Sequence, residues 1–291
     1  MNFNRRDFLK ATSLAGSGLL LGSVTNQLFA EGNGFKNKSI GLQLYTLRDD
    51  IAKDPKGVIR KVASYGYNQI ESFEGSQGMF WGMTATEFKA LMDQLHMTII
   101  SSHCDINKDF ERKAEDAAKI GMKYLICPYL GPQKSLDDYK KAAEHFNDRG
   151  RICKKHGIRF AYHNHDYSFV PIDGVLPQDI FMQHTDKDLV DFEMDIYWVV
   201  TAGEDPNKWF DKYPGRFKLC HVKDRKKDTP LSVKDASCIL GEGSIDFASI
   251  LKNGQKKGLK YTIVEQELYE NTTPLEAAKV DAAYLKKLSL A

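Results

Sequence analysis

Short apolar runs of strand length alternate with longer amphipathic segments of helix length from residue 39 to the C-terminus. The expected strands lie at 39–47, 67–73, 98–104, 123–130, 159–165, within 189–199, at 217–224 and at 260–267. The expected helices lie at 54–66, 84–95, 107–121, 135–157, 177–184, 205–213, 246–258 and 273–290, and a long polar loop lies at 225–244. Eight strand–helix units over roughly 250 residues predict an α/β fold, the (β/α)8 or TIM barrel, with a doubly wound open sheet as the alternative.

Several expected helices carry their own start and stop signals. Asp54-Pro55 opens one helix with proline in its first turn, and Gly66 closes it. Thr84 with Glu87 three residues later forms a capping box. Neither a GxGxxG turn after the first strand nor a GxxxxGK[ST] motif occurs, so the sequence does not predict a nucleotide-binding loop.

The first 30 residues have the order of an export signal. The pair Arg5-Arg6 precedes an apolar stretch rich in small residues that ends at Ala30. This stretch is too short and too rich in Gly and Ser for a stable membrane span. The paired arginines resemble a twin-arginine signal; an ordinary secretion signal or a retained anchor is the alternative. We expect a cleavable signal peptide at 1–30, export to the bacterial periplasm, and a barrel domain at 31–291.

Composition and charge exclude some classes of function. The 291 residues include 41 Lys or Arg and 39 Asp or Glu, which leaves a formal net charge of +2. A nucleic-acid partner usually needs a clustered basic surface, so we expect none. The 5 cysteines are widely spaced and include no CxxC pair, which argues against a thiolate zinc site and against a disulfide framework.

Polar residues gather at the ends of the last four predicted strands. Functional residues of a (β/α)8 barrel lie at the C-terminal ends of the strands, and side chains two positions apart share one face. Such pairs are His163 with His165, Glu193 with Asp195, His221 with Lys223, and Glu265 with Glu267.

One imidazole or carboxylate from each of these strands is expected at the same depth in the barrel mouth: His163, Asp195, His221 and Glu265. A mixed set of this kind suits Mn²⁺, Co²⁺, Zn²⁺, Fe²⁺ or Ni²⁺ better than Ca²⁺ or Mg²⁺. Each residue alone is more often a hydrogen-bonded structural group. Four of them converging on one mouth would be costly to bury without a purpose. The sequence therefore predicts one divalent metal.

The earlier strands supply candidates for substrate contact. Gln43 and Tyr45 lie in the first expected strand, and Glu71 lies in the second. Trp81 and Trp198 follow strand ends and can stack on a sugar face, with simple packing as the alternative. We expect these five residues to bind substrate.

Motifs along the whole barrel segment resemble one known group of proteins. They are Gly41–Arg48 (GLQLYTLR), Tyr162–Asp166 (YHNHD), Glu193–Asp195 with Trp198, His221–Asp224 (HVKD), Gly241–Asp246 and Ile263–Glu265. Together they are similar to the xylose isomerase-like sugar phosphate isomerase/epimerase superfamily over residues 39–290. In that superfamily one divalent metal is held at the ends of the fifth to eighth strands, which implies His163, Asp195, His221 and Glu265 here.

One departure from the superfamily bears on the reaction. Its ketose 3-epimerases have Glu at the position of His163, and there two metal-bound carboxylates form the acid–base pair. An imidazole that binds metal cannot accept a proton at the same nitrogen. The resemblance therefore implies an isomerase, an inosose-type dehydratase or a lyase acting on 3-keto-glycosides rather than a two-carboxylate epimerase.

The expected chemistry is removal of a proton next to a sugar carbonyl, giving an enediolate that the metal stabilises. The candidate catalytic residues are Glu265, His165, His103, Glu193 and Lys223. His103 has a substrate hydroxyl contact or a structural role as its alternatives. The expected partner is a small keto-sugar, and a homodimer is possible. A non-catalytic carbohydrate-binding barrel and a barrel endonuclease are the alternatives from other classes.

Overall fold

The computed structural model describes residues 39–288, which belong to one compact unit, Gly34–Ala291. The signal peptide predicted at 1–30 lies outside the described residues. No helix in the described part is both long and apolar enough to cross a membrane.

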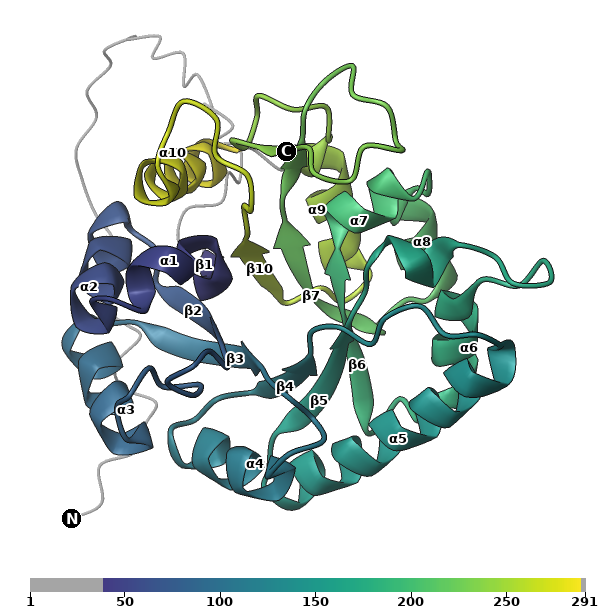
Figure 1. Cartoon of the computed structure of the whole chain (residues 1–291), viewed down its shortest axis with the longest axis horizontal. Coiled ribbons are helices and arrows are strands. Elements are labelled where there is room, and N and C mark those ends of the chain that lie inside the picture. The colour runs from purple at the N-terminus through teal and green to yellow at the C-terminus, as the bar shows by residue number, and fades with distance from the viewer. Residues whose placement is uncertain (1–38, 289–291) are drawn as a thin grey trace, which may run out of the picture. The chain divides into compact units, whose positions relative to one another are not determined.

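Eight parallel strands close into a barrel in the order β1-β10-β7-β6-β5-β4-β3-β2, which confirms the predicted fold (Figure 1). The strands are β1 Gly41–Gln43, β2 Gln69–Phe73, β3 Thr98–His103, β4 Tyr124–Cys127, β5 Arg159–His163, β6 Val190–Asp195, β7 Phe217–Val222 and β10 Tyr261–Val264. The short strands β8 Asp224–Arg225 and β9 Ser237–Cys238 form a separate antiparallel hairpin.

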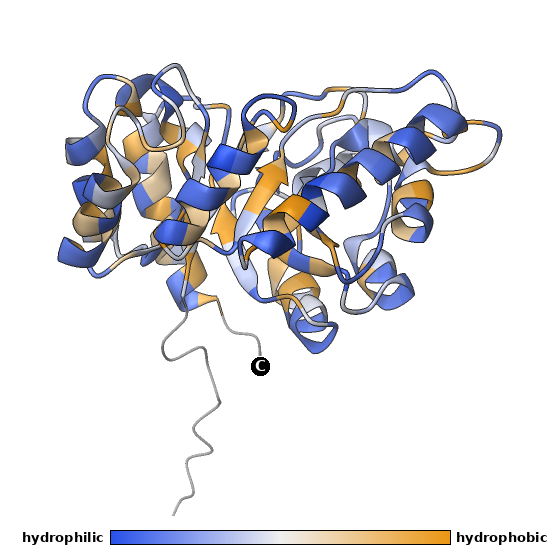
Figure 2. Cartoon of the chain, turned by 90° about the horizontal axis from the view of Figure 1, so that it is seen from below, coloured by the Kyte–Doolittle hydropathy of each residue, from blue (hydrophilic) through white to orange (hydrophobic). Residues whose placement is uncertain are grey.

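Helices surround the barrel on the outside (Figure 1). They are α1 Arg48–Ile51, α2 Pro55–Tyr65, α3 Ala85–Gln94, α4 Phe110–Lys119, α5 Leu136–Lys155, α6 Pro177–His184, α7 Ile196–Thr201, α8 Pro206–Lys212, α9 Phe247–Lys256 and α10 Pro274–Lys287, with 3-10 turns η1 Leu44–Leu47 and η2 Asp166–Phe169. Figure 2 shows hydrophobic strands in the interior and predominantly hydrophilic outer helix surfaces. The core accordingly lies between the sheet and the helices.

Local signals set these boundaries where the sequence predicted them. Asp54 accepts a hydrogen bond from Gly57 N at the start of α2, and Gly66 ends that helix with φ 90°. The capping box of α3 is complete, because Thr84 Oγ1 accepts from Glu87 N while Glu87 Oε2 accepts from Thr84 N. These bonds satisfy amide groups that have no partner within the helix.

The first strand is much shorter than the predicted 39–47. Gln43 Oε1 accepts a hydrogen bond from Tyr45 N, which turns the backbone into η1 directly after β1. Leu44 and Leu47, three positions apart, are both buried in that turn. Period-3 burial suits a 3-10 helix, and apolarity alone did not distinguish it from a strand.

Two other predicted segments also need correction. The fifth strand ends at His163 rather than His165, and His165 instead precedes η2. The expected loop at 225–244 contains β9 and pairs back onto β8. Glu265 lies just beyond β10, yet Glu265 N still donates to Val222 O at 3.2 Å, so the parallel pairing continues to this residue.

Candidate metal centre and active site

The barrel interior is apolar directly beneath the polar residues of the mouth. Ala161, Leu219 and Ile263 pack together with Ile100 and Ile126 in one buried cluster. Each of the first three stands two positions before His163, His221 or Glu265 on the same strand face. The period of a strand therefore places these three polar side chains on top of an apolar layer.

Glu71 on β2 supports the site from below. It is fully buried, and its carboxylate accepts hydrogen bonds from Gln43 Nε2 at 2.7 Å and Ser101 Oγ at 2.5 Å. His221 Nε2 lies 2.6 Å from Glu71 Oε1. Burial alone would raise the pKa of Glu71, but the neighbouring His103 and His221 hold it below its ordinary value. Glu71 is therefore an anion that orients His221.

The two imidazoles at His163 and His221 each direct one nitrogen upward and one downward. His163 Nε2 lies 3.7 Å from Asp195 Oδ2, while its Nδ1 lies 3.1 Å from Glu193 Oε2. His221 Nδ1 lies 3.2 Å from Glu265 Oε2 and 4.0 Å from Asp195 Oδ2. A carboxylate on the far nitrogen of a ligand histidine fixes its tautomer and its orientation.

Four residues at the mouth, called the upper group from here on, fit a divalent cation: His163, Asp195, His221 and Glu265. Ligand atoms of Asp195, His221 and Glu265 lie within 4.8 Å of one another, and His163 Nε2 faces the same carboxylate. Asp195 Oδ2 is buried and faces the Lys223 ammonium at 3.0 Å and the His163 and His221 imidazoles at 3.7 and 4.0 Å. A buried carboxylate needs a positive partner, so this atom can pair with Lys223 and with a metal cation.

A second group that could hold a metal lies deeper and overlaps the first. It consists of His103, His163, Glu193 and His221. Glu193 Oε2 already contacts His103 Nε2 at 2.8 Å and His163 Nδ1 at 3.1 Å. Because those nitrogens are engaged with Glu193, the upper group is the better candidate for a metal, with Glu193 beneath it.

Lys223 is a buried ammonium group at the same level as the upper group. Its Nζ lies 2.9 Å from Glu265 Oε2 and 2.5 Å from Glu267 Oε1, and it faces the Trp198 ring at 5.2 Å. Burial would lower the pKa of Lys223, but Asp195, Glu265 and Glu267 raise it well above its ordinary value. The site therefore contains one fixed positive charge beside its carboxylates.

Three further groups differ in pKa because their surroundings differ. Burial would lower the pKa of His103, yet Glu71 and Glu193 raise it to about 9. Burial, reinforced by the negative charge of Glu71, raises the pKa of Glu193 to about 7. Burial and the positive charge of Lys223 lower the pKa of His165 to about 3. Separated pKa values of this kind are typical of catalytic sites.

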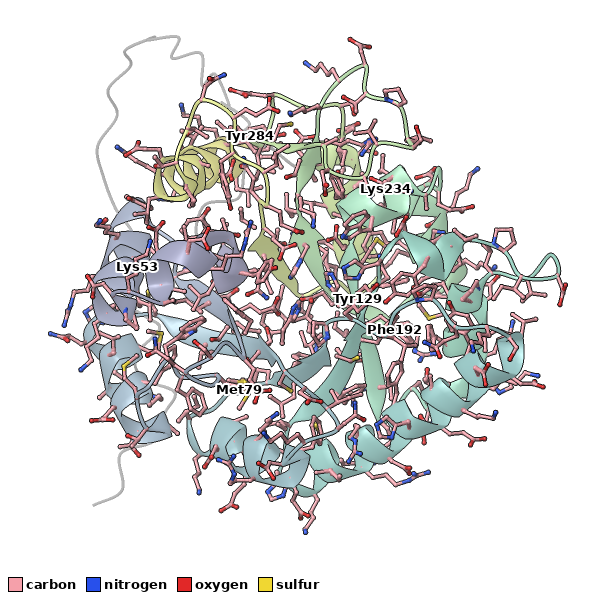
Figure 3. The ribbon with its side chains drawn as sticks, viewed as in Figure 1. Lys53, Met79, Tyr129, Phe192, Lys234 and Tyr284 are labelled. Atoms are coloured by element: carbon pink, nitrogen blue, oxygen red, sulfur yellow. The ribbon has the colours of Figure 1, made fainter. Side chains whose placement is uncertain are left out.

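A cavity of about 540 Å³ opens above these residues. That volume lies in the range of roughly 300–1,000 Å³ that small-molecule sites occupy. His103, His163, His165, Glu265 and Glu267 line it on one side, with aromatic side chains Tyr45, Phe73 and Tyr129 around them. In Figure 3 Tyr129 lies over the ring of strands near its centre.

The His165 imidazole is positioned by ring contacts. It packs edge-on against Tyr129 at 5.1 Å and lies parallel to Tyr167 at 5.7 Å. Its buried Nδ1 has no hydrogen-bond partner among residues 39–288. His165 therefore offers an imidazole to a bound molecule.

Other residues predicted to contact substrate or take part in catalysis lie elsewhere. Gln43, Glu71 and Glu193 are buried beneath the cavity and do not line it. Trp81 is packed in the core, where its Nε1 donates to Ser72 Oγ at 3.2 Å. Trp198 lies in the first turn of α7, where its backbone N donates to the side chain of the N-cap residue Asp195. Its side chain lines a second, adjoining cavity.

Two contributors to the site were missed by the sequence analysis. Tyr129 follows the fourth strand and lines the cavity. Its position at a strand end is the signal that could have identified it. Asn164 clamps the ends of β5 and β6, because its side chain exchanges two hydrogen bonds of 3.3 Å with the backbone of Asp195. The sequence does not distinguish an asparagine that links two strands in this way from one that binds a metal.

Comparison with known proteins supports the family relationship. The sequence profile of the xylose isomerase-like TIM barrel family matches residues 59–288. An inosose dehydratase of Clostridium perfringens is 30% identical over 165 residues, which cover 52% of this chain and 55% of that protein. The chain thus matches about half the length of this curated relative.

Solved structures show the same fold. A sugar phosphate isomerase/epimerase of Parabacteroides distasonis is 30% identical, with a TM-score of 0.75 over 86% of this chain and 98% of that one. The IOLI protein, solved with a zinc atom, has a TM-score of 0.70 over 84% of this chain and 96% of that one. At 14% identity, this second likeness concerns the fold alone.

Proposed function

The chain belongs to the xylose isomerase-like TIM barrel family, and on that basis we propose that it is a divalent-metal-dependent enzyme that removes a proton next to the carbonyl of a sugar-like substrate. The observation that carries this proposal is the convergence of His163, Asp195, His221 and Glu265 beneath a cavity.

The four residues would hold the cation, which would supply Lewis-acid polarisation of the substrate carbonyl. That effect acidifies the hydrogen on the adjacent carbon. Zinc in the IOLI structure and magnesium in a Mycobacterium smegmatis barrel are consistent with a divalent ion, but they do not identify this one.

We assign proton transfer to the histidines that line the cavity outside the metal set. His165 lines the cavity, and its lowered pKa leaves a neutral imidazole that can accept the carbon-bound proton. The His163 ring lies between the other two, with centroids 5.0 Å from His103 and 5.1 Å from His165. His103, whose pKa is raised to about 9, can therefore donate a proton at a different point of the same substrate.

The experiment is proton exchange in D₂O, followed by NMR, with 3-keto-glycosides, free ketoses and inosose as substrates and Mn²⁺, Co²⁺ or Zn²⁺ supplied. We expect loss of the carbon-bound proton with at least one of them. His165→Asn should slow this loss by about 10²–10⁴-fold, the usual contribution of an acid–base residue. His96→Asn is the matched control, because His96 is exposed and its φ of 54° is a conformation that Asn tolerates.

Metal content provides an independent check on the same proposal. Purified protein should contain about one transition metal per chain, and His221→Ala should lose both metal and activity. Full activity after removal of all metal would rule out the mechanism. Sugar binding without any exchange would favour the non-catalytic barrel instead.

β-Elimination is a second candidate, which the His163 imidazole and the dehydratase relatives favour. A base removes the proton next to the carbonyl, and the electron pair forms a C=C bond to the β-carbon. The β-oxygen then leaves with the electrons of its C–O bond and takes up a proton. The product is a conjugated enone, so a rise in near-ultraviolet absorbance would distinguish elimination from isomerisation.

We also propose that this enzyme acts after export, on an unphosphorylated keto-sugar, because sugar phosphates are mainly cytoplasmic. The export signal peptide predicted at 1–30 supports this proposal. Replacing Arg5 and Arg6 together by Lys should retain the protein in the cytoplasm, as cell fractionation would show. Unchanged export of that variant would argue for an ordinary secretion signal.

A further inference from the structure

A second cavity adjoins the first at the barrel mouth. It measures about 290 Å³, and Trp198, Lys223, Lys234 and Leu268 line it. Glu267 lines both cavities, so the two meet at this residue. In Figure 3 Tyr129, from the first cavity, lies near the centre of the barrel, and Lys234, from the second, lies above and to the right of it.

The junction lies directly above the metal-site residues. Glu265 lines the first cavity, while Lys223 lines the second and lies 2.9 Å from Glu265 Oε2 and 3.0 Å from Asp195 Oδ2. A sugar ring held at the metal position in the first cavity therefore has its substituents next to the second. A free monosaccharide would use only one of the two spaces.

The walls of the second cavity combine an aromatic ring with polar groups of both signs. The Trp198 ring of the second cavity lies 5.3 Å from the His165 ring of the first cavity, at a tilt of 31°. These two rings form part of the wall between the cavities, which meet beside them at Glu267. Lys234 pairs with Asp166 at 2.8 Å, and Arg48 donates to Glu267 O at 3.2 Å. An aromatic platform surrounded by hydrogen-bonding groups suits a hydroxyl-bearing ring.

From the two joined cavities we infer that the substrate is a two-ring glycoside: one sugar lies over the metal-site residues and the second ring lies in the cavity of Trp198, Lys234 and Leu268. This inference rests on the proposed function and specifies its substrate class. In an elimination the second ring would be the leaving group, held where it departs. An isomerase acting on a free sugar would not need the second cavity.

The test is binding, measured by calorimetry on the Mn²⁺-loaded full chain, with cellobiose and glucose as probes that lack the ketone of the proposed substrate. We expect cellobiose to bind about tenfold more tightly than glucose. Leu268→Trp, which fills the second cavity, should bring the ratio of the two dissociation constants close to one. Lys234→Ala, at a half-exposed position, should lower the same ratio without a change in the packed core.

Val175→Trp adds the same bulk to an exposed loop position outside both cavities and should keep the parental ratio. Equal affinity for the two probes, or no cellobiose binding at millimolar concentration, would overturn the inference. Equal weakening of both probes by Leu268→Trp would overturn it as well. A preserved preference for cellobiose without any proton exchange would instead contradict the proposed function and leave the two-ring site standing.

Discussion

At the scale of single residues, the site depends on which nitrogen of each imidazole faces upward. Glu71 and Glu193 are buried beneath His221 and His163 and engage their lower nitrogens. The upper nitrogens are thereby directed at Asp195 and Glu265. These two glutamates thus act through the ligands rather than on the substrate.

Glu71→Gln tests this positioning role. The amide keeps the size of the side chain but removes the charge that pairs with His221, so we expect metal affinity to fall by about 10–100-fold. Competition with a chelator would measure the loss, and circular dichroism would check that the barrel is intact. Glu144→Gln, an exposed position on α5, is the matched control. Unchanged affinity in Glu71→Gln would show that His221 is oriented without it.

At the scale of elements, the loop after β7 is held by one carboxylate. Asp224 Oδ1 accepts from Arg225 N and Ile245 N at 2.8 and 3.2 Å, and Oδ2 accepts from Gly241 N and Gly243 N at 2.9 and 3.1 Å. The Gly243 backbone approaches Asp224 so closely that a Cβ on Gly243 would lie 2.1 Å from Asp224 Oδ1. Asp224 therefore closes the loop that carries Lys234 and Ser237 to the second cavity.

Asp224→Ala should destabilise the fold by about 3 kcal/mol, because two buried and two partly buried N–H groups lose their acceptor at once. Urea unfolding would measure the loss, and faster proteolysis within 225–244 would locate it. Asp224→Asn keeps one acceptor oxygen and should cost less. Exposed Asp235→Ala on the same loop should change stability little.

At the scale of the whole molecule, metal binding and folding are linked. The four candidate metal-site residues lie on or directly after four different strands, so the set exists only in the folded barrel. A ligand that binds only the folded state at 100 times its Kd adds about 2.7 kcal/mol of stability. We expect Mn²⁺ or Zn²⁺ to raise Tm in the parent chain and to leave His221→Ala unchanged. An equal rise in both would place the binding elsewhere.

A second effect at this scale is the dependence of stability on pH. Burial raises the pKa of Asp281, in α10, to about 7, and its Oδ2 has no hydrogen bond among residues 39–288. An unfolded Asp has a pKa of about 3.9. Between these values the native state binds a proton that the unfolded chain has released, so stability falls as pH rises towards 7.

Asp281→Asn should therefore gain stability relative to the parent chain when the pH is raised from about 5 to about 8. One unit of pKa shift corresponds to about 1.4 kcal/mol. The amide can still accept from Leu240 N, which donates to Asp281 Oδ1 at 2.8 Å. Urea unfolding at both pH values, with Glu144→Gln as the surface control, would measure the difference. A pH-independent difference would mean that Asp281 titrates alike in both states.

The amino-acid sequence by itself predicted the barrel, and it named four residues that the structure brings together at the mouth. Strand and helix periodicities are local properties, and residues two apart on a strand share a face wherever the strand lies. His163, Asp195, His221 and Glu265 could therefore be assigned to one level of the mouth. Caps such as Thr84 with Glu87 are equally local, and they set helix boundaries as predicted.

Only the tertiary structure decided what each polar residue faces. Gln43 ends β1, whereas Glu71 and Glu193 lie two residues before the ends of β2 and β6, and closure of the barrel buries all three below the cavity. Trp81 and Trp198 both follow strand ends, yet one packs in the core and the other lines a cavity. The depth of a side chain and its contacts depend on distances between strands that are far apart in the sequence. Local periodicity holds no information about those distances.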